Sequence, residues 1–76
     1  MLRINIGTSY DTEEKIINEN TTIRQAFKDA GVSLTSGTIV TNNGSRLGDR
    51  DLDKTFAELG VEEDALITAN EKTIGA

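Results

Sequence analysis

The side chains that could do chemistry in this sequence are mostly carboxylates. The 76 residues include 13 Asp and Glu but no Cys and no His. Without these two residue types the chain has no thiolate nucleophile, no imidazole base and no zinc site of the Cys/His kind. A Ser nucleophile would need an unusual base such as Lys, and no motif places one. We therefore predict that the protein is not an enzyme and binds no cofactor.

One group of carboxylates has the spacing of metal ligands. Asp49, Asp51 and Asp53 alternate as calcium ligands do in an EF-hand loop. That loop also needs glycine at its sixth position and an acidic residue at its twelfth. Counted from Asp49, these positions hold Lys54 and Gly60. We therefore expect no calcium site here.

The acidic residues are unevenly distributed. The net charge of the chain is −5. The segment from Asp49 to Asp64 contains seven acidic and two basic residues, so this segment alone accounts for the net charge. Such a surface repels nucleic acid and anionic membranes, whose binders need cations. Two interpretations remain. The segment is either a docking face for a basic partner protein, with contacts from Asp49, Asp51, Asp53 and Glu58, or a solvated face that keeps a small domain soluble.

Tyr10 is a second candidate for partner binding. It is the only tyrosine and lies in a polar stretch between two predicted strands. Aromatic side chains with a polar tip are enriched in binding hot spots. The alternative is that Tyr10 covers the edge of its own small core.

The elements that position these residues begin with a predicted hairpin. Residues 2–7 alternate between apolar and polar side chains, as a half-buried strand does. A second, more polar strand is predicted at about 13–19, built around Ile16 and Ile17. A short polar link joins the two strands, which is typical of a hairpin.

A helix over residues 22–30 has the clearest local signal. Thr22 and Gln25 fit a capping box at its start. Phe27 lies on an apolar stripe with helical spacing, and Gly31 follows the last apolar position, where a left-handed residue is favoured.

The second half of the chain predicts another hairpin, a short helix and a last strand. Asn43-Gly44 is the favoured pair for a type I′ turn. The predicted elements are strands at 38–41 and 46–47, a short helix from Asp51 to Leu59 that ends at Gly60, and a strand at 65–70.

This order of elements resembles ubiquitin and its bacterial relatives over essentially the whole chain. The resemblance is carried by the opening alternation, by Thr22-Ile23, by Gly44-Ser45-Arg46-Leu47 and by the stretch from Leu52 to Leu59. It implies a single α+β domain over residues 1–76 with the ubiquitin-like β-grasp fold. The expected architecture is a mixed four- to five-stranded sheet packed on one main helix, with a short second helix and a flexible tail at 71–76.

The family resemblance leaves several functions open, because ubiquitin-like folds serve as modifiers, sulfur carriers and interaction domains. Modifiers and carriers end in Gly-Gly, and an E1-like enzyme activates the terminal carboxylate, whereas this chain ends in Gly75-Ala76. The leading prediction is a non-catalytic adaptor or accessory subunit that binds another protein. The alternatives are a modifier or carrier activated at Gly75-Ala76, and a small acidic inhibitor.

Two further expectations concern recognition and location. Receptors read ubiquitin through an apolar patch whose positions correspond to Thr41 and Thr68, so we expect generic ubiquitin receptors not to bind this polar surface. The sequence has no Cys, no long apolar run and no signal-peptide pattern, which predicts a cytoplasmic protein. The resemblance to the bacterial relatives of ubiquitin implies a bacterial origin.

Overall fold

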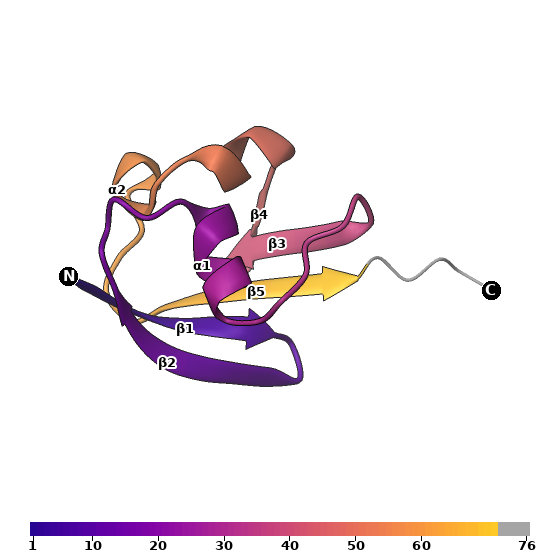
Figure 1. The fold of residues 1–76 in the computed structure, drawn as a ribbon, viewed down its shortest axis with the longest axis horizontal. Helices are drawn as coiled ribbons and strands as arrows, with labels where there is room; N and C mark the ends of the chain where they lie inside the picture. The colour runs from indigo at the N-terminus through magenta and orange to yellow at the C-terminus, as the bar shows by residue number, and fades with distance from the viewer. Residues whose placement is uncertain (72–76) are drawn as a thin grey trace.

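Five strands and one main helix make up the computed structural model, which describes residues 1–71 (Figure 1). The strands are β1 (Leu2–Thr8), β2 (Asp11–Ile17), β3 (Thr38–Asn42), β4 (Ser45–Leu47) and β5 (Ala65–Glu71). The helices are α1 (Ile23–Asp29), the 3-10 helix η1 (Asp49–Asp53) and α2 (Phe56–Leu59). Within residues 1–71 no helix is long and apolar enough to cross a membrane.

The strands form one mixed sheet in the order β2-β1-β5-β3-β4. β1 and β5 are parallel, and all other neighbouring strands are antiparallel. α1 crosses one face of this sheet (Figure 1), which is the β-grasp arrangement. The predicted α+β fold class, with its mixed sheet and one main helix, is therefore confirmed.

The core lies between α1 and the sheet. Its side chains with no exposed surface include Phe27 and Ile23 of α1, Ile4 of β1 and Ile67 of β5. The predicted apolar stripe of the helix therefore does face the sheet. The buried apolar side chains are Leu2, Ile4, Ile6, Ile23, Ala26, Phe27, Val40, Leu52, Phe56, Val61, Ala65, Ile67 and Ala69.

Only half of the predicted capping box forms at the start of α1. The backbone N–H of Gln25 donates to the Thr22 hydroxyl at 3.1 Å, as expected. The Gln25 side-chain amide donates instead to Asp29, one helical turn further on, at 2.8 Å. At the other end Gly31 has a φ of +77°, the left-handed conformation predicted for it.

The second strand begins and ends two residues earlier than the predicted 13–19. Thr8 pairs with Asp11, so the hairpin turn consists of only Ser9 and Tyr10. The chain leaves the sheet at Asn18, whose carbonyl accepts a hydrogen bond from Thr21 in a tight turn. In this turn the chain after Ile17 turns away from β1, so the pairing ends there.

The predicted short second helix exists as α2, but its predicted bounds, Asp51 to Leu59, are wrong, because the first part of this stretch belongs to η1. Between η1 and α2, Lys54 and Thr55 are extended and bond to the segment before α1. The N–H of Ile23 donates to the Lys54 carbonyl at 3.0 Å, and the N–H of Phe56 donates to the Thr21 carbonyl at 3.2 Å. These bonds between distant segments hold the chain extended at the point where the sequence pattern alone would continue a helix.

Candidate interaction surfaces

Three of the four acidic residues predicted to contact a partner make hydrogen bonds or ion pairs within the domain itself. The Asp51 carboxylate accepts from the Gly48 N–H at 3.1 Å and lies 3.3 Å from the Lys54 ammonium. Asp53 accepts from Nε of Arg24 at 2.9 Å. Glu58 and Thr55 bond reciprocally at 3.2 and 3.1 Å, a complete capping box that starts α2. Asp49 is exposed on η1.

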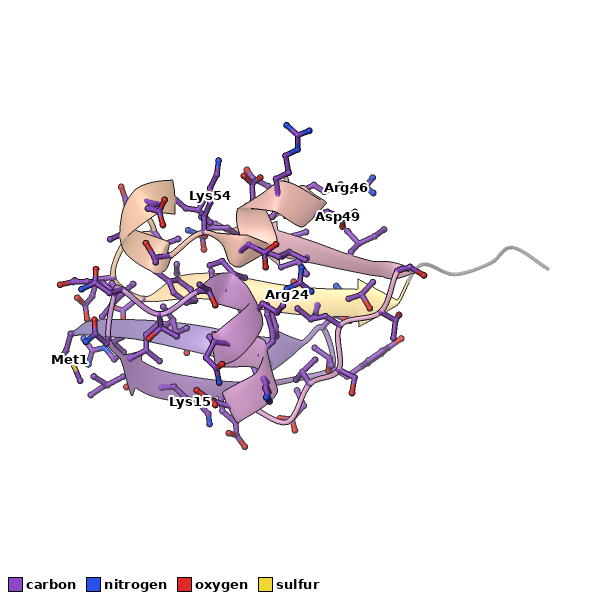
Figure 2. The ribbon with its side chains drawn as sticks, turned by 45° about the horizontal axis from the view of Figure 1, so that its top comes forward. Met1, Lys15, Arg24, Arg46, Asp49 and Lys54 are labelled. Atoms are coloured by element: carbon purple, nitrogen blue, oxygen red, sulfur yellow. The ribbon has the colours of Figure 1, made fainter. Side chains whose placement is uncertain are left out.

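The fold also divides the acidic segment into two parts with different surroundings. Around η1, Arg24 and Lys54 pair with the acidic residues, and Arg46, Asp49 and Lys54 lie on the same side of the molecule (Figure 2). The turn before β5 lies instead beside β1, where Arg3 pairs with Asp64. The two parts of the segment therefore have different ion-pair partners. Whether Asp49, Asp51, Asp53 and Glu58 contact a partner stays a prediction.

Asp51 makes the stability of this region depend on pH. The hydrogen bond from the Gly48 N–H, followed by that from Lys54, holds the pKa of Asp51 below its usual value of 3.8. A depressed folded-state pKa stabilises the fold above the usual pKa, and this contribution is lost as the pH falls through the lower, folded-state value.

We therefore expect Asp51→Asn to lower the melting temperature at pH 7 and to flatten its decline between about pH 5 and pH 2. Asp49→Asn is the matched control, because it removes the same charge from an exposed position of the same helix. Thermal melts followed by circular dichroism across this pH range make the comparison. Identical pH profiles for the two variants would show that the bonds to Asp51 do not carry the pH dependence.

Tyr10 lies at the tip of the β1–β2 hairpin with 98% of its surface exposed. The alternative that it covers its own core is therefore wrong. The hairpin tip is tied to the rest of the fold, since the Ser9 N–H donates to the Asn70 side chain at 2.9 Å and the Tyr10 N–H donates to the Thr8 hydroxyl at 3.3 Å. The backbone that carries Tyr10 is thus held in place while its ring faces solvent.

An open groove of about 700 Å³ adjoins Tyr10. Its walls are the hairpin tip, residues 31–33 after α1, the start of β3 and the end of β5. Every described residue that lines it is uncharged, in a chain of which 28% is charged. Val32 and Ala69 give it apolar surface, while Thr8 and Asn70 give it hydrogen-bonding groups.

Thr41 and Thr68 lie opposite each other on β3 and β5. Their hydroxyl oxygens are 2.7 Å apart, and Thr68 is only 8% exposed. The two hydroxyls therefore form a hydrogen bond with each other.

The remaining predicted site residues, Gly75 and Ala76, lie outside the described residues, and so does the end of the predicted tail. No protein-family model matches the chain, and no curated protein matches it either.

Proposed function

We propose that this protein is a ubiquitin-like interaction domain that acts as an adaptor or accessory subunit and catalyses no reaction itself. The β-grasp topology and the ubiquitin-like motifs of the sequence support the family assignment. The lack of Cys and His supports a binding role, because the commonest nucleophile and base of protein active sites are missing.

The observation that carries the proposal is the exposure of Tyr10 beside a groove whose described lining residues are all uncharged. A tyrosine that becomes buried in a complex removes about 150 to 250 Å² of its own surface from water. Because the hairpin tip is already tied to Asn70, binding there would order little more than the Tyr10 side chain. We infer that Tyr10 is an anchor for a partner protein whose contacting segment is itself uncharged.

The test is to place a photo-crosslinking residue at position 10, and at position 12 as a control, in the native cell. A protein captured only through position 10 is identified, purified and titrated with the wild type, Tyr10→Ala and Thr12→Ala. We expect Tyr10→Ala to weaken binding by about tenfold or more, and Thr12→Ala to have little effect. A purified partner that binds Tyr10→Ala as tightly as the wild type would contradict the proposal.

The same titrations test the predicted acidic contacts. Asp49→Lys is the informative variant, because reversing Asp51, Asp53 or Glu58 would also break bonds within the fold. If a basic partner docks here, Asp49→Lys should slow association at low salt more than it speeds dissociation. An association rate that is unchanged at low salt would remove Asp49 from the interface.

The carrier and modifier alternatives are separated from the adaptor by the intact mass of protein from its native cell. An adaptor is expected as the unmodified chain. A thiocarboxylate on Ala76, or an isopeptide bond from Ala76 to another protein, would replace the adaptor proposal with activation by an E1-like enzyme.

A further inference from the structure

Two large apolar side chains are exposed on the face of the sheet that is turned away from α1. Ile16 on β2 is 65% exposed and Leu66 on β5 is 44% exposed. The register places Ile16 opposite Arg3 and Leu66 opposite Asn5. Arg3 and Asn5 alternate along β1 with the buried Ile4, so all four side chains stand on the outer face.

A cluster of charges surrounds these two residues and has Arg3 at its centre. Arg3 Nε lies 2.8 Å from Asp64 Oδ1 and 3.9 Å from a Glu63 oxygen, and Arg3 Nη1 lies 3.8 Å from Glu14. The Glu63 carboxylate also accepts from the Arg3 backbone N–H at 3.1 Å. Three acidic side chains lie around this one basic side chain, so the cluster itself has a net negative charge.

Arg3 lies on the strand between the two strands that carry Ile16 and Leu66. It stands between Ile16 on one neighbouring strand and the start of β5 on the other. Its bond to Asp64, and after that the charges of Asp64 and Glu14, raise the pKa of the guanidinium above its usual value, so the guanidinium keeps its charge. The hydrocarbon stem of a paired arginine adds apolar surface between neighbours.

We propose that this surface, formed by Ile16, Leu66 and the acidic residues around Arg3, binds a basic amphipathic helix of a partner protein. Charge complementarity selects the partner, because a second copy of this chain or an anionic membrane would bring further negative charge to the same place. The spacing favours a helix. Ile16 and Leu66 are two strands and two residues apart, about 12 Å, and positions i and i+7 of a helix are about 10.5 Å apart.

This surface is separate from the groove beside Tyr10. Tyr10 is at the turn of the β1–β2 hairpin, whereas Ile16 pairs with Arg3 near the opposite end. Met1, which is labelled in Figure 2, lies at this opposite end and is also exposed. The inference does not depend on the proposed function, but two surfaces at opposite ends of one hairpin would let a single domain bridge two partners.

The test uses a synthetic peptide of about 18 residues, with leucines at helical spacing on one face and lysines on the other. It is titrated into ¹⁵N-labelled protein, with a peptide of the same pattern carrying glutamates in place of lysines for comparison. We expect the lysine peptide to shift the amide resonances around Arg3, Ile16 and Leu66, and the glutamate peptide to shift none. The double variant Ile16→Ser with Leu66→Ser should weaken the affinity by about tenfold or more.

Further variants separate specific docking from general attraction to an acidic protein. Glu14→Gln with Glu63→Gln should weaken binding of the lysine peptide, while Tyr10→Ser should leave it unchanged. Resonance shifts spread over the whole acidic surface, or equal affinities for the wild type and the double serine variant, would overturn the proposal. Dimerisation in sedimentation equilibrium that is lost in the double serine variant would also overturn it, since the occupant would then be a second copy.

Discussion

Replacement of Phe27 by Ala is expected to lower the free energy of unfolding by about 3 to 5 kcal/mol. The side chain has no exposed surface and belongs to the core between α1 and the sheet. A domain of this size has only about 5 to 15 kcal/mol of stability in total. The loss is large because the truncated side chain leaves a cavity that its neighbours fill only in part.

Urea unfolding followed by circular dichroism measures this loss. Phe27→Leu is the matched control, because it keeps most of the buried volume and should cost clearly less than Phe27→Ala. Lys28→Ala changes the next residue on the exposed face and should cost little. If Phe27→Ala unfolds already without urea, the midpoint of Phe27→Leu still places the position in the core. Both Phe27 variants unfolding at the wild-type midpoint would mean that α1 does not pack on the sheet as described.

Local patterns predicted the parts of the fold that neighbouring residues determine. The apolar stripe around Phe27 predicted α1, and Asn43-Gly44 predicted the tight turn, where both residues have positive φ. The break between η1 and α2 could not be predicted in this way. It depends on hydrogen bonds between residues 21–23 and residues 54–56, and a local sequence pattern contains no information on a partner some thirty residues away.

Local sequence patterns were also insufficient to predict the candidate surfaces. The acidic segment looked continuous because its charges are neighbours in sequence, yet Arg24 pairs with Asp53 and Arg3 pairs with Asp64 only after folding. The sequence analysis did not predict the surface formed by Ile16, Leu66 and the acidic residues around Arg3, although one signal for it was present. Ile16 and Ile17 are adjacent in a strand, so alternation must turn one of them away from the core, and the register decides that it is Ile16.

Replacement of Gly7 by Ala is expected to cost about 2 to 3 kcal/mol, the second largest effect that we predict. A Cβ atom at this position would overlap the Asp11 carbonyl oxygen and would lie 2.9 Å from the Thr12 Cα. Both obstacles are backbone atoms, so no change of side-chain rotamer relieves the overlap. β2 would have to move away from β1 where the two strands approach the hairpin turn.

Gly31→Ala separates this steric overlap from the conformational preference of glycine. Gly31 also has positive φ, but a Cβ there meets nothing within 4 Å, so its replacement should cost only about 1 kcal/mol. Urea unfolding of both variants gives the difference. Equal losses would show that the close approach of Asp11 to Gly7 is not what requires glycine at position 7.

Gly7 also connects the fold to the proposed binding site. The turn that follows it carries Tyr10, and the Asn70 side chain holds that turn through the Ser9 N–H. A methyl group at position 7 should therefore move the hairpin tip and the groove while leaving the ion pairs of Arg3 at the other end intact. In an amide spectrum, Gly7→Ala should shift the resonances of Ser9, Tyr10 and Asn70 and spare those of Arg3 and Asp64. With the purified partner, its binding loss should then resemble that of Tyr10→Ala, whereas the lysine-rich helical peptide should bind as it does to the wild type.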